Sequence, residues 1–230
     1  VLNYESAKQE LPANSRSHDL YAIMQSNNSS ARWGWRYITL PYIEELSRFN
    51  IILGKIQAQA VAGGYTPNSN QPELKDIVDA WLCPSDFFNT VQANGGNTKA
   101  GANYAACHGD RFGQSTKDVF HDTQGAFISG FDCSGGGSWT GGTCKKRSVR
   151  LKDITDGLSN TVSLGEVRMG DGTLDSRKGG AGITGGINQN AEPIRCQELL
   201  DANGMYSGTA ARVTHAIGRR GMDSNEPHAL

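Results

Sequence analysis

Apolar residues recur at helical spacing in four segments of the N-terminal half. In the first segment, residues 1–12, one helical face carries Val1, Leu2, Tyr4, Ala7 and Leu11. Pro12 ends this pattern. The spacing predicts further helices over residues 35–46, 50–62 and 72–82, and Pro41 is a kink or first-turn residue in the second helix. The first helix has no cap before residue 1, so we expect it to be the end of a helix that begins upstream.

The second half of the chain changes to short runs of β-branched and aromatic residues. They lie between Gly, Asp or Asn residues, as strands do, at residues 101–109, 125–131, 147–151 and 160–169. Alternation predicts a half-buried strand over Thr161–Val167. Gly157 is placed to cap a single helical turn. Helices followed by strands predict one α+β domain over residues 1–230, with long glycine-rich loops.

Composition restricts the partners. The chain has 230 residues, a net charge of −1 and no apolar run near the roughly 18 residues that span a bilayer. Nucleic acid and anionic membranes therefore have no electrostatic support as partners. The one basic cluster, Lys145–Arg150, is interpreted as a solvated run in preference to a phosphate site. The first residues do not form a cleavable signal peptide.

The cysteines predict an oxidising compartment. Five occur, at Cys83, Cys107, Cys133, Cys144 and Cys196, with no CxxC pair and no zinc-finger histidine spacing. The glycine-rich loop between Cys133 and Cys144 has few core residues, so we expect a disulfide that closes an insertion at residues 130–147; this would stabilise by roughly 3 kcal/mol. Cys83 and Cys107 are the next expected pair, and Cys196 is left over. Five reduced cysteines in a cytosolic protein are the alternative.

No catalytic or cofactor-binding residue is predicted. P-loop, HExxH and Gly-x-Ser-x-Gly motifs are absent, and the Gly-x-Gly-x-x-Gly at Gly180–Gly185 lies in a glycine-rich loop where a dinucleotide site is not expected. Ser85 and Asp86, with His108, invite a comparison with a triad, but Pro84-Ser85-Asp86 is typical of a turn. We therefore expect a protein that is not an enzyme.

Two groups of residues could bind a ligand, a calcium ion or a sugar, but each group also has a purely structural interpretation. Asp153 and Asp156 are candidate ligands for a structural Ca²⁺ ion, against the alternative that they cap turns. Glu166 is a ligand or a salt-bridge partner at the rim of the core. An aromatic group could stack on sugars or form core: Trp33, Trp35, Tyr42 and Trp81. We favour the structural interpretation in each case.

Several phrases of the sequence share one family resemblance. They are NYESAKQELP (Asn3–Pro12), WGWRYITLPYIEEL (Trp33–Leu46), WLCPSD (Trp81–Asp86), the strand at Asn103–Gly109 and DITDGLSNTVSLGE (Asp153–Glu166). In this order the chain resembles the pseudopilin-like secreted proteins of planctomycetes and their relatives. That family is described as a domain of unknown function behind a prepilin-type N-terminal helix.

The resemblance implies a pilin-like fold, in which an N-terminal helix packs on a small antiparallel β-sheet. It implies a non-enzymatic subunit of a type II secretion or type IV pilus-like system, with other pseudopilin or secretion subunits as partners. The expected location is the periplasm, the cell surface or the medium, with a membrane anchor in the full-length protein. An extracellular solute- or carbohydrate-binding module is the alternative, and a hydrolase is a third.

Two family features are absent from this sequence. They are the membrane-inserting helix and a C-terminal His followed nine residues later by Asp-Gly. We expect both ends to be missing, and with the second the partner of Cys196. Without the hydrophobic helix, the chain is expected to be monomeric or weakly associated.

Overall fold

The computed structural model describes the helical region, the strand pairs and the segments that join several of them. Every element named below lies within the described residues, which are 1–13, 33–59, 72–86, 92–94, 97–107, 126, 131–133, 144–146, 148–169, 175, 177, 183–184, 200–205 and 211–212.

Helices occupy the N-terminal part, close to where the sequence predicts them. The two longer ones are α1 (Leu2–Lys8) and α4 (Leu46–Gln59). Between them α3 (Trp35–Thr39) passes directly into the 3-10 helix η2 (Leu40–Ile43). Pro41 stands at the start of η2, where its missing N–H is not needed. Of the two alternatives for Pro41, the first-turn position is therefore confirmed, in the 3-10 helix that follows α3.

The predicted helix over residues 72–82 is wrong. The structure has two single 3-10 turns instead, η3 (Pro72–Leu74) and η4 (Asp79–Trp81), with Val78 extended before the second. Long-range bonds explain the difference, because the carbonyl of Leu74 accepts from Ala100 N–H at 3.0 Å and cannot serve the next helical turn.

The strands form four separate two-stranded antiparallel pairs within the described residues. These pairs are β1 (Gln92–Asn94) with β2 (Asn97–Lys99), β3 (Tyr104–Ala106) with β6 (Leu164–Glu166), β4 (Phe131–Cys133) with β5 (Cys144–Lys146), and β7 (Ile183–Thr184) with β8 (Ala211–Arg212). The predicted strands around residues 104 and 164 are confirmed and pair with each other. The strand predicted at residues 147–151 is wrong, because Leu151 begins the 3-10 helix η6 (Leu151–Asp153).

Two apolar clusters hold these elements together, and α3 lies between them. Trp33, Tyr37 and Ile38 enter the larger cluster, which joins α1, α4, η3 and η4, and Trp35 enters a smaller cluster beside β3 and β6. Neighbouring residues of α3 thus pack in opposite directions, so this short helix is buried all round.

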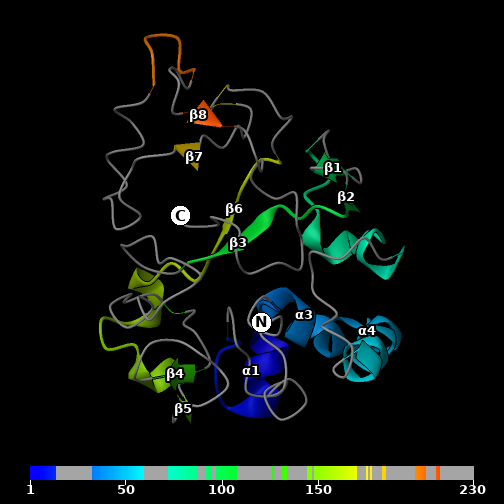
Figure 1. The fold of residues 1–230 in the computed structure, drawn as a ribbon. Helices are drawn as coiled ribbons and strands as arrows, with labels where there is room; N and C mark the ends of the chain where they lie inside the picture. Colours follow the sequence, from blue (N-terminus) through cyan, green and yellow to red (C-terminus); the bar gives the residue numbers. More distant parts are fainter. Residues whose placement is uncertain are drawn as a thin grey trace.

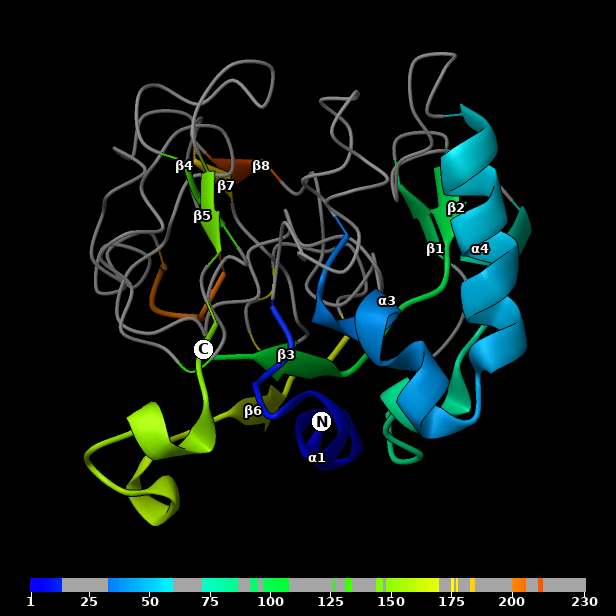
Figure 2. The ribbon, with the colours of Figure 1, turned by 90° about the horizontal axis from the view of Figure 1, so that it is seen from below.

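The N-terminal segment contacts both clusters. Tyr4 of α1 is 1% exposed in the larger cluster and meets Tyr42 edge to face at 5.1 Å between ring centroids, whereas Leu11 packs in the smaller one. Figures 1 and 2 show α1 near the β3–β6 pair, with α3 and then α4 to the right of α1 in both views. The architecture is mixed α+β, with an N-terminal helix beside a small antiparallel pair.

Candidate functional site

Asn103 is the centre of a buried polar junction that joins three distant segments. Its side chain is fully buried, and its amide Nδ2 donates to the carboxylate of Asp86 and, at 3.0 Å, to the carbonyl of Val167. Its Oδ1 accepts from the N–H of Cys83 at 2.9 Å. Buried amides need partners for each polar atom, and Asn103 finds them on both sides of the β3–β6 ladder.

The turn Cys83–Asp86 is a structural connector. The Asp86 carboxylate accepts from the N–H of Met169 at 2.8 Å as well as from Asn103, and Asp86 N–H donates to the carbonyl of Cys83. Ser85 is exposed on the turn, and His108 lies outside the described residues. The Asp86 carboxylate thus accepts from a backbone N–H and a side-chain amide, as a carboxylate in a structural turn does.

The aromatic residues of the Trp33–Tyr42 segment are core residues. Trp33, Trp35 and Trp81 are 0%, 6% and 5% exposed. Trp33 lies 4.7 Å from the ring of Tyr37, which stacks on Phe49 at 5.0 Å. These three tryptophans therefore offer no open platform on which a sugar could stack.

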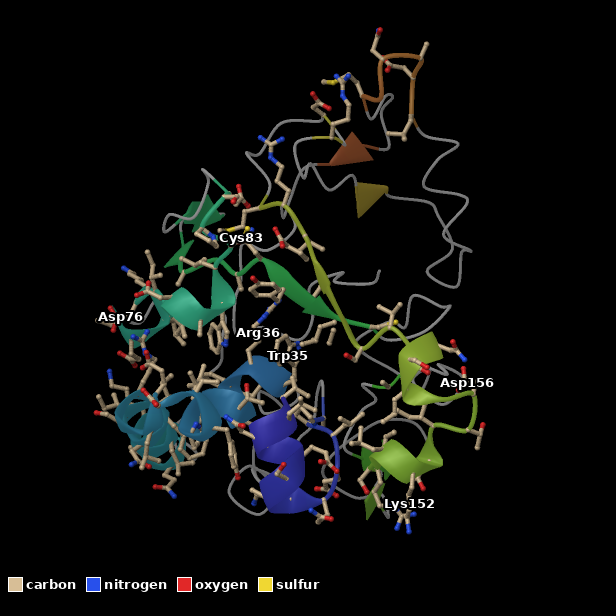
Figure 3. All side chains as sticks on the ribbon, turned by 180° about the vertical axis from the view of Figure 1, so that it is seen from behind. Trp35, Arg36, Asp76, Cys83, Lys152 and Asp156 are labelled. Atoms are coloured by element: carbon tan, nitrogen blue, oxygen red, sulfur yellow. The ribbon has the colours of Figure 1, made fainter. Side chains whose placement is uncertain are left out.

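Arg36 brings a positive charge into this core. It is 3% exposed, its guanidinium lies over the Trp35 ring at 5.2 Å and its Nη2 donates to the carbonyl of Tyr104 in β3. Figure 3 shows Trp35 and Arg36 directed from α3 toward the β3–β6 pair. Arg36 thus joins the helical part to the strands through a charge-assisted bond and a cation–π contact.

Residues 150–161 form a surface segment that is held by its own hydrogen bonds. Asp153 accepts from the backbone N–H, Nε and Nη2 of Arg150, each at 3.0 Å, and so uses both carboxylate oxygens. These hydrogen bonds lower the pKa of Asp153 and raise the pKa of Arg150. The 3-10 helix η7 (Leu158–Asn160) follows, and Asn160 Nδ2 donates to the carbonyl of Asp156 at 2.9 Å.

The calcium hypothesis gains no support from this segment. Asp153 is engaged in the turn-capping role that was its alternative. No group of three or more His, Cys, Asp or Glu side chains suited to a metal ion occurs in the described part of the chain. Asp156 and Lys152 are both exposed and point outward from η6 and the following turn (Figure 3). Glu166 is also exposed, and none of the ion pairs found between described residues involves it.

Comparison with known proteins gives one match. A family model described as "Protein of unknown function (DUF1559)" matches residues 1–227. The chain belongs to the DUF1559 family. This is a family of secreted proteins of the planctomycete type, and it has no assigned molecular activity. No curated protein and no solved structure matches the chain.

The family match agrees with the resemblance carried by the sequence phrases of this DUF1559 chain. The match does not show that the chain is a pseudopilin. Among the described residues, no helix is long and apolar enough to cross a membrane.

The two disulfides predicted for this DUF1559 chain have different outcomes. The predicted Cys83–Cys107 disulfide is not formed, because both are free thiols. Cys83 N–H bonds to Asn103, and Cys107 follows four extended residues later, about 13 Å along the ladder. That places the two Cα atoms beyond the about 4.4–6.8 Å that a disulfide spans.

Cys133 and Cys144 have a backbone arrangement suited to a disulfide. They are directly opposite in the β4–β5 pair, and such partners have Cα atoms about 4.5–5.5 Å apart, within the disulfide range. Their side chains and all of Cys196 lie outside the described residues. So do Gly180, Gly182 and Gly185, the three glycines of the Gly-x-Gly-x-x-Gly phrase. The Cys133–Cys144 bond therefore stays a prediction.

Sequence reasoning missed Asn103 and Arg36 as connecting residues. For each of them the sequence contains one indication, a polar residue within an apolar run. Asn103 stands alone between apolar residues in Gly101–Ala106, and Arg36 interrupts the apolar run of Trp35–Ile38. A polar side chain within a buried run requires a partner, but the sequence does not say which distant segment supplies it.

Proposed function

We propose that this DUF1559 chain is a non-enzymatic, pseudopilin-like subunit that works in a type II secretion or type IV pilus-like assembly. Its partners are other pseudopilin or secretion-system subunits. It acts in the periplasm, at the cell surface or in the medium, and a prepilin-type helix anchors the full-length protein in the membrane. The sequence resemblance and the match to a secreted family support this proposal.

The attachment of α1 to the body of the domain is the observation that carries the proposal. Asn3 Nδ2 donates to the carbonyl of Tyr42 at 3.1 Å, Tyr4 is buried among core aromatics, and Leu11 N–H donates to Val149 at 2.7 Å. These contacts hold the N-terminal segment at several points along its length. A subunit that is positioned in an assembly through its N-terminal helix needs this rigid connection between helix and domain.

One side of α1 stays available for a neighbour. Leu2 is 70% exposed, while Tyr4 of the same helix faces the core. An exposed leucine on the side opposite the core is accessible for packing against another helix. In the proposed assembly, this side of α1 contacts the helix of an adjacent subunit.

Site-specific photocrosslinking in the native host tests the proposal. A benzophenone side chain replaces Leu2 in the full-length protein, and the control carries it at Gln57, which is exposed on α4. We expect export of both proteins and cross-links to pilin-like subunits several-fold stronger from position 2. Retention in the cytoplasm, or equal cross-linking from both positions, would contradict the proposed function.

An extracellular solute- or carbohydrate-binding module is the other interpretation. A sugar site built by stacking requires exposed aromatic rings, and Trp33, Trp35 and Trp81 are buried. These tryptophans oppose a sugar site built on them and favour the subunit role.

A further inference from the structure

Asn203 is an exposed asparagine that is followed directly by a glycine. The sequence contains two Asn-Gly pairs, Asn94-Gly95 and Asn203-Gly204, and the structure describes both residues of the second pair. Because glycine has no side chain, its backbone nitrogen can approach the side chain of the preceding asparagine. The pair lies in the loop 200–205, which Figure 1 shows in orange at the upper edge of the molecule. Asn203 is therefore a position at which the chain itself can react.

The reaction open to an Asn-Gly pair is deamidation. The Gly204 nitrogen loses its proton to a base in the solvent and attacks Cγ of Asn203. A bond between this nitrogen and Cγ forms, the bond from Cγ to the side-chain nitrogen breaks, and ammonia leaves with a proton from water. Water then opens the five-membered ring at either carbonyl, which leaves aspartate or isoaspartate at position 203. The rate depends on how often the Gly204 nitrogen is free to attack.

Hydrogen bonds to Asp201 hold this pair in the folded protein. Gly204 N–H donates to the carbonyl of Asp201 at 2.9 Å. The Asp201 carboxylate accepts from the N–H of Asn203 at 2.8 Å and from the N–H of Met205 at 2.9 Å. Asp201 N–H donates in turn to the carbonyl of Met205 at 2.9 Å. The attacking nitrogen is thus engaged through its proton, and the main chain on both sides of it is fixed.

We propose that Asn203 is a site of spontaneous deamidation and that Asp201 sets the rate of this reaction. While the turn Asp201–Met205 is closed, the Gly204 nitrogen is held in its hydrogen bond and reacts slowly. Local opening of the exposed turn releases the nitrogen, and the reaction then proceeds as it does in an unfolded chain. This chemistry belongs to the chain itself and does not depend on the proposed secretion role.

The backbone conformation of Gly204 explains why a reactive residue stands at this position. Its φ is 75°, in the left-handed region that glycine adopts without the steric cost that other residues have. The closed turn therefore favours glycine here, although glycine is also the residue that obstructs attack on Asn203 least. The same loop thus combines a reactive sequence with a turn that protects it.

Deamidation opens this turn permanently. Isoaspartate at position 203 adds a methylene group to the main chain, and either product adds a carboxylate two residues from that of Asp201. The backbone N–H groups of residues 203 and 205 then no longer both reach the Asp201 carboxylate. Met205 also forms a bridge with Asp175, which is 6% exposed. We expect modified chains to lose this contact between the loop and Asp175.

Deamidation rates of the whole chain test the proposal. Folded and guanidinium-denatured samples are incubated at mildly alkaline pH, and mass spectrometry follows the tryptic peptide Cys196–Arg212, with fragment ions that locate the change at position 203. The folded wild-type chain should react roughly a hundredfold more slowly than the denatured chain. Asp201→Ala removes two of the bonds and should speed the reaction of the folded chain roughly tenfold. Asp201 is exposed, so this variant should keep the wild-type melting temperature.

Asp201→Asn is the matched control. Its side chain loses the charge but keeps an oxygen that accepts from the same two N–H groups, so its rate should stay within about twofold of the wild-type rate. Equal rates in the folded and denatured wild-type chain overturn the proposal, as does an Asp201→Ala chain that reacts as slowly as wild type. An Asp201→Asn chain as fast as Asp201→Ala also overturns it, because the rate then follows the charge and not the hydrogen bonds.

Discussion

The Trp33–Ile43 segment and the 150–163 segment both carry family phrases, yet the structure uses them in opposite ways. In the first, Trp33, Tyr37 and Leu40 have no exposed surface. In the second, Leu158 and Val162 are 54% and 59% exposed, and the backbone is held by bonds between residues three or four apart. The first segment is specified by packing against distant residues. The second is held largely by local hydrogen bonds and leaves Leu158 and Val162 at the surface, although Leu151 and Ile154 are partly buried against the smaller cluster.

The largest difference between the two regions is expected from removing an apolar side chain. Trp33→Ala should lower the free energy of unfolding by about 4 kcal/mol, because it empties a fully buried site between α3 and its neighbours. The control Leu158→Ala should change it by less than about 0.5 kcal/mol. Urea denaturation of the two variants measures both values, and similar losses would show that the 150–163 segment is packed in solution.

The same asparagine replacement should have different costs in the two regions. Asn103→Ala leaves Asp86, Cys83 N–H and the Val167 carbonyl without their buried partner, so we expect a loss of about 3 kcal/mol. Asn160→Ala removes one exposed bond to Asp156 and should cost about 0.5 kcal/mol. Thermal unfolding under identical conditions compares them. A loss at Asn103 as small as that at Asn160 would mean that the buried junction does not connect the segments.

Glycine replacements should differ in sign. Gly54 lies in α4 with open space where a Cβ would stand, so Gly54→Ala should stabilise by about 1 kcal/mol through helix propensity. Gly157 has φ +91° in the surface segment, where Gly157→Ala should destabilise by about 1 kcal/mol despite free space. Chemical denaturation gives the two signs, and stabilisation by both alanines would remove the special backbone role of Gly157.

The two regions should respond to opposite ends of the pH range, with the smallest effects near neutrality. Burial raises the pKa of Tyr37. Its contribution is full below the unfolded-state pKa of about 10 and is lost as the pH rises, by about 1 kcal/mol near pH 11. Tyr37→Phe should remove this alkaline loss, as unfolding curves at pH 7 and 11 would reveal; an unchanged loss would assign it to another group.

Asp153 provides the acid counterpart. Its pKa is lowered by the hydrogen bonds from Arg150, so its contribution is present above the unfolded-state value of about 3.9 and is lost as the pH falls through the folded one. Because the pair is fully exposed, we expect only a slight shift in acid unfolding for Asp153→Asn. A large acid shift would mean that Arg150 and Asp153 support more than their own turn.

Local patterns were sufficient to predict several elements. The helical spacing in residues 1–12, the first-turn position of Pro41 and the alternation over residues 161–167 correspond to α1, the start of η2 and β6. Each depends on neighbours a few residues apart, which the sequence contains. The family phrases are of the same kind, and they agree with membership of DUF1559.

Local patterns could not predict contacts between residues that are far apart in the sequence. Residues 72–82 have helical spacing, but the carbonyl of Leu74 is bonded to Ala100. The sequence predicted a disulfide between Cys83 and Cys107, but the extended β3 strand separates the two residues. In both cases a bond between residues twenty or more positions apart decided the outcome.

By itself the sequence determined the α+β class, because that follows from short-range spacing, and it indicated the family through the resemblance of its ordered phrases. Only the tertiary structure decided that Asn103 and Arg36 connect the segments and that Trp33, Trp35 and Trp81 are core residues. These features depend on which residues meet across the fold, since a buried polar atom is defined by the partner it has.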